Sequence, residues 1–254
     1  MTRFSANLGF LWTELDIPDA IHAAKTAGFA AVECHWPYDT PAKDVQIALD
    51  HTGLQMLGLN TRRGDVAGGE NGLSALPDRE EEARAAIEEA IDYANVVSAG
   101  SIHVMAGYAT GAEARGVFVQ NLKWAADKAK ECGITLLIEP LNRHDAPGYF
   151  LETTDQAVDI IRDVSADNLK LMFDCYHVGR TEGDIITRLS KLHDLIGHIQ
   201  FASVPDRGAP DHGEVNFQAV FDAIGAMGWT MPLGAEYKPG KDTNASLGWM
   251  QDLT

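Results

Sequence analysis

Apolar strand-like runs alternate with helix-like stretches along nearly the whole chain, and this alternation restricts the fold more than any other feature. Several of the helix-like stretches end at a glycine, which is the residue that most often closes a helix. Strands that read as apolar runs and are joined by helices are typical of a parallel sheet. The eight runs are Phe4–Phe10, Phe29–His35, Leu54–Asn60, Ser101–Ala106, Ile134–Asn142 and the segments LKLMFDCYH, IGHIQFA and MPLGAEYKP.

Eight strand–helix units in about 250 residues predict a (β/α)8 TIM barrel, in which the chemistry lies at the carboxyl ends of the strands. A doubly wound sheet is the alternative, but the glycine-rich phosphate fingerprint that often follows its first strand is missing. We expect one catalytic domain over residues 1–254. The predicted helices lie near Pro18–Ala27, Ala42–His51, Asp78–Ser98, Ala112–Glu131, Thr154–Val164, Gly183–Leu192, Phe217–Met227 and Asn244–Leu253.

The last four strand-like runs each place an oxygen-bearing side chain near their carboxyl ends: Glu139, Asp174, Gln200 and Glu236. Side chains alternate between the two faces of a strand, so these four project from the same relative position of successive strands. Any one of them alone would read as a helix cap or a salt-bridged loop residue. A carboxylate that ends a buried strand is costly unless it binds a metal or a partner. The repeated position therefore predicts a metal site, and its all-oxygen ligands suit Mg²⁺ or Mn²⁺ better than Zn²⁺.

Glu139 and Glu236 also suggest a reaction, because they are expected to face each other across the ion. The metal would polarise a carbonyl and a neighbouring hydroxyl, and one carboxylate would remove a proton that the other returns at an adjacent position. Metal coordination lowers the basicity of a carboxylate, so the metal must stabilise the enediolate by more than the base loses. No redox cofactor is required.

Basic residues follow several strand-like runs although the formal net charge is −17. That charge argues against nucleic acid as a partner. Positive charge at the mouth of the barrel instead suggests a small anionic substrate, and the arginine fork suits a carboxylate. Each basic residue taken singly also reads as a solvated loop residue. We expect Arg207 and Lys238 to bind the substrate, with Arg62 as a further candidate.

His177, three residues after Asp174, is predicted to lie on a loop and to bind the substrate or a metal ligand. The alternatives are a solvated histidine and a ligand of a multi-zinc centre. His103 and His198 read as core histidines. The ends of the first three runs are predicted to line the pocket with Asn7, Glu33, His35, Trp36 and Asn60.

The remaining composition describes an ordinary soluble protein, with 45% apolar and 22% charged residues. No apolar run reaches the length of a membrane span, and the first residues do not resemble a signal peptide. Cys34, Cys132 and Cys175 are an odd number without metal-binding spacing, which indicates reduced thiols. We therefore expect a cytoplasmic protein without a membrane partner, and leave open whether it forms a homo-oligomer.

Eight segments are informative together: FSANLGF, GENGLSALPDRE, IHVMAG, IEPLNRHDAPGYFL, FDCYH, EGD, GHIQFASVPDRGAPDHGEVNF and GAEYKP. They resemble the hydroxypyruvate isomerase family of the xylose-isomerase-like barrels, which also include ketose 3-epimerases. The resemblance covers nearly the whole chain. It implies a divalent metal held by Glu139, Asp174, Gln200 and Glu236, with the two glutamates as the acid/base pair. It also places His177 and Arg207 at the substrate and Glu214 in the loop after the seventh strand.

The activity that this resemblance implies is a metal-dependent interconversion of hydroxypyruvate and tartronate semialdehyde through an enediolate. A 2-oxo-tetronate isomerase and a ketose 3-epimerase of the same fold are alternatives. A zinc hydrolase of the apurinic endonuclease type is a different class, which Gln200 at a ligand position and the net charge disfavour. A non-catalytic barrel is disfavoured by the intact pair of glutamates.

Overall fold

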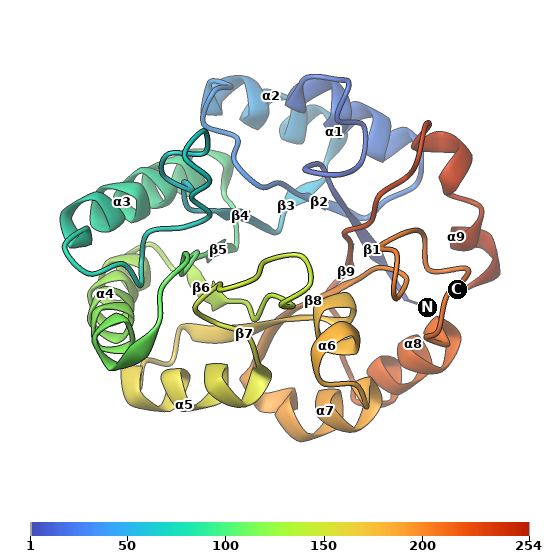
Figure 1. The fold of residues 1–254 in the computed structure, drawn as a ribbon. Helices are drawn as coiled ribbons and strands as arrows, with labels where there is room; N and C mark the ends of the chain where they lie inside the picture. Colours follow the sequence, from blue (N-terminus) through green and yellow to red (C-terminus); the bar gives the residue numbers. More distant parts are fainter. Residues whose placement is uncertain (1, 254) are drawn as a thin grey trace.

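A computed structural model describes residues 2–253, and their strands form one parallel sheet curled into a barrel (Figure 1). Around the ring the order is β3-β2-β1-β9-β8-β7-β6-β5-β4. The strands are β1 (Phe4–Asn7), β2 (Ala31–Glu33), β3 (Gln55–Met56), β4 (Gly58–Asn60), β5 (Ser101–His103), β6 (Thr135–Ile138), β7 (Leu169–Asp174), β8 (Ile196–Phe201) and β9 (Leu233–Ala235).

The third predicted strand is divided into β3 and β4, which are separated only by Leu57. Leu57 N donates to Val32 O at 2.8 Å, and Cys34 N donates to Gly58 O at 3.1 Å. These bonds join β2 to both halves and close the ring, so eight strand positions surround the axis. The predicted TIM barrel is confirmed.

The helices form an outer ring around the strands (Figure 1). Local sequence explains where several begin and end: Asp16 caps α1 by accepting from Asp19 N, and α2 ends at Gly53 with a left-handed φ of 68°. Among the described residues, no helix combines the length and apolar character needed to cross a membrane. The helices are α1 (Ile17–Thr26), α2 (Ala42–Thr52), α3 (Glu80–Val97), α4 (Gly111–Glu131), α5 (Thr154–Val164), α6 (Cys175–Thr181), α7 (Ile185–Leu192), α8 (Phe217–Ala226) and α9 (Trp249–Asp252), with short 3₁₀ turns at His193–Leu195 and Asn244–Ser246.

Several predicted elements have other bounds in the structure, and one helix was not predicted. Residues 8–10 of the first strand-like run form a turn, because Asn7 accepts from Gly9 N through its side chain and from Phe10 N through its carbonyl. The predicted helix Asn244–Leu253 is broken into a 3₁₀ turn and α9, with the poor helix former Gly248 between them. The unpredicted α6 starts directly after β7, where Asp174 caps it by accepting from Tyr176 N.

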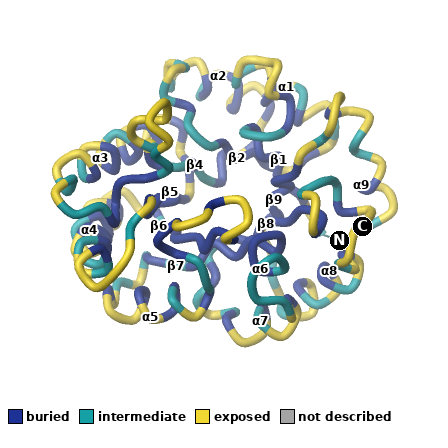
Figure 2. The backbone as a smooth tube through the Cα atoms, in the orientation of Figure 1, coloured by how far each residue is buried: buried dark blue, intermediate teal, exposed yellow. Residues whose placement is uncertain are grey.

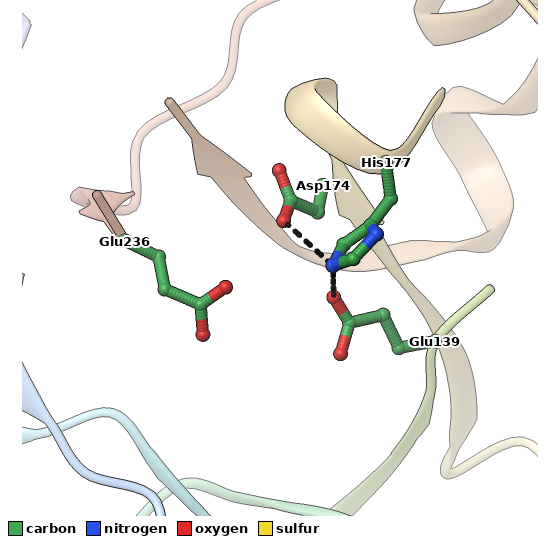
Figure 3. Close-up of side chains that lie close together, drawn as sticks. All are labelled: Glu139, Asp174, His177 and Glu236. Carbon is green, nitrogen blue, oxygen red and sulfur yellow. Dashed lines mark ion pairs between the residues drawn. The ribbon is translucent and has the colours of Figure 1, made fainter. Parts of the chain in front are cut away.

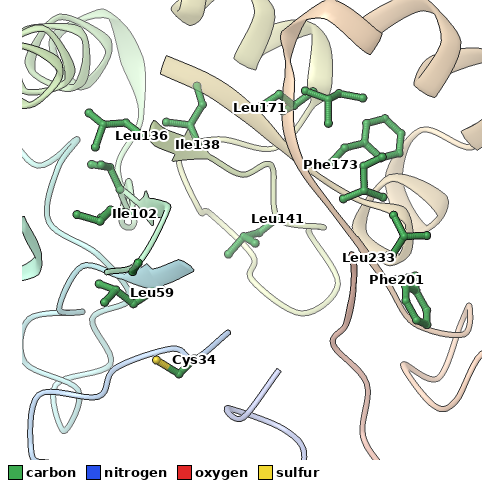
Figure 4. Packing of buried hydrophobic residues seen from close by; sticks show 14 of the residues in the cluster. Cys34, Leu59, Ile102, Leu136, Ile138, Leu141, Leu171, Phe173, Phe201 and Leu233 are labelled. Carbon is green, nitrogen blue, oxygen red and sulfur yellow. The ribbon is translucent and has the colours of Figure 1, made fainter. Parts of the chain in front are cut away.

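The core lies between the barrel and the helices, and strand periodicity decides which residues enter it. Alternate residues such as Leu136 and Ile138 on β6, or Leu171 and Phe173 on β7, are buried in one apolar cluster with helix residues (Figure 4). Burying each of these side chains contributes roughly 1.5–3 kcal/mol. The barrel strands are dark and the outer faces of the helices are exposed in Figure 2. The residues between the core positions therefore face the barrel axis.

Candidate active site

Four buried side chains converge at the carboxyl ends of the strands: Glu139, Asp174, His177 and Glu236 (Figure 3). Their potential ligand atoms all lie within 4.8 Å of one another. Glu139 follows β6, Asp174 ends β7 and Glu236 follows β9, while His177 comes from α6. The barrel thus brings together groups that are far apart in the sequence.

The polar atoms of this cluster have the character of a cation site. Among the described residues, Glu139 Oε1, Asp174 Oδ2 and Gln200 Oε1 are buried acceptors without a hydrogen-bond partner. Asp174 and Gln200 are also directly paired across β7 and β8. Buried acceptors without partners are costly, and a divalent ion would satisfy all three. Together with Glu236 they could hold an ion that prefers oxygen ligands, so the residues fit the metal that the family resemblance implies.

Arg207 supplies the positive charge nearest to the cluster. Its guanidinium contacts the Glu236 carboxylate and lies 3.8 Å from Asp174 Oδ2. The guanidinium carbon is 4.7 Å from the centre of the Phe10 ring and 5.0 Å from that of Tyr176. Burial would lower the pKa of Arg207, but Glu236 and Asp174 outweigh burial and raise it. Arg207 is therefore a charged group held among carboxylates, rather than a flexible loop residue.

The cluster distributes its charge unevenly. Burial raises the pKa of Glu139 well above its ordinary value, and the nearby carboxylates of Glu236 and Asp174 add to this effect. Burial, followed by Glu236, raises the pKa of Asp174 to about 7. Burial would also raise the pKa of Glu236, but Arg207 and His35 outweigh it and lower that pKa. Without a further cation, Glu236 is the carboxylate best kept ionised.

His177 is a neutral hydrogen-bond donor toward the cluster. Its Nδ1 accepts from Asn142 N at 2.9 Å, which leaves the ring proton on Nε2. Nε2 lies 3.6 Å from Asp174 Oδ2 and 3.8 Å from Glu139 Oε1 (Figure 3). Burial, with a contribution from Arg207, lowers the pKa of His177 to about 3. The predicted loop position was wrong, because α6 holds this residue over the pocket.

A network of amide and carboxylate groups supports the cluster from the strand ends. Gln200 Nε2 donates to Glu33 Oε1 at 2.8 Å and to Glu236 Oε1 at 3.2 Å. Asn7 Nδ2 bridges the same two carboxylates, at 3.0 Å from each. His35 Nε2 lies 2.9 Å from Glu236 Oε1. The oxygens of Glu236 are thus engaged by the protein, whereas Glu139 Oε1 is not.

A cavity of about 180 Å³ opens over the cluster. Of the predicted substrate-binding residues, His35, Asn60, His177 and Arg207 line it. Its apolar walls are Phe10, Trp36, Met105, Leu141 and Ala146, with Tyr108 beside them. A larger cavity of about 720 Å³ lies at the opposite end of the barrel, by the strand starts at Ser101, Thr135 and Ile196. That end is remote from the carboxylates, so the smaller cavity is the candidate active site.

Four predicted substrate-binding residues are not brought to this cavity. Asn7 is buried and bridges Glu33 and Glu236 instead, and Glu33, which was also predicted to line the pocket, does not line the cavity. Lys238 is exposed, and only its backbone N–H meets the site region, by donating to Arg207 O at 2.7 Å. Glu214 is exposed as well. The Arg62 side chain points to α3, where its Nε lies 2.7 Å from Glu89 Oε2. Proximity to a strand end in the sequence did not determine the direction of these long side chains.

The sequence did not predict that a further histidine and a further carboxylate would line the cavity. His103 was predicted to be a core residue, but it lines the cavity and its Nδ1 lies 3.4 Å from Glu139 Oε2. The predicted strand extended to Ala106, which placed His103 inside the strand, whereas β5 ends at His103. Asp145 also lines the cavity, and its Oδ2 accepts from the Tyr176 hydroxyl at 2.7 Å. No signal marked Asp145 in the sequence, because it lies in an irregular loop.

Comparison with known proteins places the chain in a family. The xylose isomerase-like TIM barrel family matches residues 21–253. The chain is 43% identical to a 2-oxo-tetronate isomerase of Cupriavidus necator, with 99% of this chain and 98% of the relative covered. It is 37% identical to a hydroxypyruvate isomerase of Escherichia coli, with 98% of each covered.

Solved structures show the same fold. A crystal structure described as an AP endonuclease of family 2 from Brucella melitensis has a TM-score of 0.96 and 34% identity, with 99% of each chain covered. An L-ribulose 3-epimerase has a TM-score of 0.80 at 20% identity, covering 99% of this chain and 86% of that one, and shows the fold alone. The chain therefore belongs to the xylose isomerase-like TIM barrel family and, within it, to the hydroxypyruvate and 2-oxo-tetronate isomerases.

Proposed function

We propose that the protein is a divalent-metal-dependent isomerase of small 2-oxo acids, which interconverts hydroxypyruvate and tartronate semialdehyde. The observation that supports this most is the set of buried acceptor oxygens without partners on Glu139, Asp174 and Gln200, three residues that come, like Glu236, from the carboxyl ends of barrel strands. These residues suit Mg²⁺ or Mn²⁺. The relatives named as isomerases of hydroxypyruvate and 2-oxo-tetronate support the same class of substrate.

The ion would supply Lewis acidity that polarises the ketone and the neighbouring hydroxyl oxygen of the substrate. Asn7, His35 and Arg207 engage Glu236 rather than Glu139, so we assign to the Glu139 carboxylate the removal of a proton from the hydroxymethyl carbon. Glu236, fixed by Asn7, His35 and Arg207, is its partner in the acid/base pair. One proton returns to the former ketone carbon, and the hydroxyl proton moves to the former ketone oxygen. The product is an isomer, so no oxidant or reductant is needed.

The other cavity groups suit a substrate with a carboxylate. Arg207 offers a charged fork at the cavity, and His177 directs its Nε2 proton toward the space beside Glu139. The cavity of about 180 Å³ is smaller than the roughly 300–1,000 Å³ of sites for larger ligands. Its size and its arginine favour a short anionic substrate over a free ketose.

A second candidate is the isomerisation of 2-oxo-tetronates, which the relative with 43% identity favours. Both substrates present a carboxylate, a ketone and a neighbouring hydroxyl, so the same residues would act on them. The name of the Brucella melitensis structure points instead to an apurinic endonuclease. A multi-zinc hydrolase needs several histidine ligands, whereas the cluster found among the described residues contains one histidine, and the chain carries a net charge of −17.

The test is metal-dependent exchange of substrate protons with solvent deuterium. The protein, stripped with EDTA and then given Mn²⁺ or Mg²⁺, is incubated in D₂O with hydroxypyruvate, a 2-oxo-tetronate or a neutral ketose, and NMR follows the label. We expect metal-dependent exchange and isomerisation of the acids and far slower reaction of the ketose. Glu139→Gln should abolish exchange while Mn²⁺ still binds. Exchange that persists in EDTA, or full activity of Glu139→Gln, would contradict the proposal.

A further inference from the structure

Glu33 is a buried carboxylate that the proposed mechanism does not use. It ends β2, whereas Glu139 follows β6, and it does not line the cavity above the cluster. Within residues 2–253, each hydrogen bond that reaches its side chain comes from a different strand residue. Ser5 and His198 reach Oε2 at 3.1 and 2.6 Å, and Asn7 and Gln200 reach Oε1 at 3.0 and 2.8 Å.

The bond from Gln200 is important because an amide side chain has two chemically different ends. Its NH₂ group only donates and its oxygen only accepts, and the two can exchange places by a rotation of the terminal torsion. Gln200 Nε2 donates to Glu33 Oε1 at 2.8 Å and to Glu236 Oε1 at 3.2 Å, so the shorter bond to Glu33 is the stronger reason for the amide nitrogen to lie on this side. The amide oxygen of Gln200 then points away from Glu33, and it is buried without a partner among the described residues.

The backbone leaves room for this contact. A Cβ atom built on Gly234 would lie 2.7 Å from both Gln200 Cγ and Glu33 Oε1. Gly234 is paired with Gln200 across β8 and β9, so only a residue without a side chain lets the two groups meet there. The contact between Glu33 and Gln200 therefore depends on three strands.

We infer that Glu33 is a positioning residue for the metal site, which orients the Gln200 amide so that its oxygen serves as a ligand. This rests on the proposed function, in that Gln200 is one of the residues proposed to hold the ion. Groups that orient metal ligands in this way typically contribute 10- to 100-fold in metal affinity. Glu33 itself contacts neither the ion nor the substrate in this arrangement.

The test measures the Kd for Mn²⁺ from the EPR signal of free Mn²⁺, without substrate. In Glu33→Gln the new amide can donate as well as accept, so only the longer bond from Gln200 Nε2 to Glu236 Oε1, at 3.2 Å, still favours the original orientation of Gln200. We expect Mn²⁺ binding to weaken by about 10- to 100-fold in this variant and similarly in Gln200→Ala. Because both changes remove the same interaction, the double variant should be no more than about threefold weaker than the weaker single variant.

Matched variants distinguish an effect on the orientation of the Gln200 amide from an effect of the Glu33 charge and from a loss of folding. Glu33→Asp keeps the negative charge but shortens the side chain by one methylene, so its Mn²⁺ affinity should also fall. Ser5→Ala removes a different hydrogen bond to Glu33 and should leave the affinity within about threefold, since His198 still holds the same oxygen. Thermal unfolding in EDTA shows whether each variant is folded. At saturating Mn²⁺ the kcat of Glu33→Gln should recover, whereas that of Glu139→Gln should not.

The outcomes distinguish this inference from the proposed function. If the unmodified protein binds neither Mn²⁺ nor Mg²⁺, the proposed metal-dependent function fails. If it binds Mn²⁺ and Glu33→Gln binds equally well, only the role of Glu33 is overturned. Effects of Glu33→Gln and Gln200→Ala that multiply in the double variant, or unchanged affinity in Glu33→Asp, would show that Glu33 acts through its charge, which also overturns the positioning role.

Discussion

Replacing Arg207 by methionine should make the stability of this protein depend more strongly on a divalent metal. The substitution keeps an apolar side chain between Phe10 and Tyr176 but removes the cation that contacts Glu236. Removing one partner of a buried ion pair costs about 3–5 kcal/mol. Protonation limits this cost, because holding a carboxyl group of ordinary pKa protonated near pH 7 requires about 3.4 kcal/mol. We therefore expect a loss of about 3 kcal/mol in EDTA.

For a chain of this size, about 3 kcal/mol corresponds to a fall in Tm of roughly 6–12 °C. Excess Mn²⁺ would bring positive charge back to Glu236 and Asp174, so the rise in Tm on adding Mn²⁺ should be larger in Arg207→Met than in the unmodified protein. Circular dichroism in EDTA and in Mn²⁺ measures both values.

Arg62→Met is the matched control, because Arg62 and Glu89 form an ion pair with side chains 44% and 42% exposed. It should cost less than about 1 kcal/mol, with no dependence on metal. The reasoning about the buried cluster is refuted if Arg207→Met has the Tm of the unmodified protein in EDTA, or if Mn²⁺ raises the Tm of both proteins equally.

Three further predictions concern activity, thiol access and pH. Arg207→Ala should lower kcat/KM for 2-oxo acids by roughly 100-fold, the loss of a charge-assisted contact, and steady-state kinetics at saturating Mn²⁺ measure it. Cys132 is exposed and the other two cysteines are buried, so a thiol reagent should modify one thiol in the native protein and three after unfolding. Hydrogen bonds to Asp211 and then Asp206 raise the pKa of His212, so its stabilising effect is complete below the unfolded pKa and disappears as pH rises through the raised value. His212→Gln should lower the Tm by at most about 2 °C near pH 6 and not at all near pH 9, because these side chains are exposed.

The cluster could be predicted because strand periodicity and barrel geometry are repeated along the chain. Asp174 and Gln200 fall near the ends of apolar runs whose alternate residues enter the core. Because side chains alternate between the two faces of a strand, this spacing alone directs both side chains toward the barrel axis. Glu139 and Glu236 each come one residue after their strands end, and the same alternation carries them to the same place. These positions can be predicted without knowing which strands are neighbours in the ring.

Other features of the site depend on contacts that periodicity does not encode. The helix α6 depends on Asp174 as its cap, and this side chain also offers an oxygen to the cluster. The position of His103 depended on where β5 ends, and that end is set by pairing with β4 and β6. The side chains of Arg62 and Lys238 are long, so a correct position in the chain left their direction undetermined. That residues 1–254 form one catalytic domain stays a prediction.

The charges of the cluster indicate how Arg207 can bind Glu236 when no metal is present and a substrate carboxylate when the metal is bound. Three carboxylates, those of Glu139, Asp174 and Glu236, face the single guanidinium of Arg207, so the cluster when fully ionised keeps a negative excess. A divalent ion offsets that excess and reduces the attraction that holds Arg207 against Glu236. The guanidinium already lines the cavity, stacked beside Phe10 and Tyr176, so it need move little to meet an anion there. Metal binding should therefore strengthen binding of a substrate carboxylate, and by linkage the substrate should strengthen binding of the metal by the same factor.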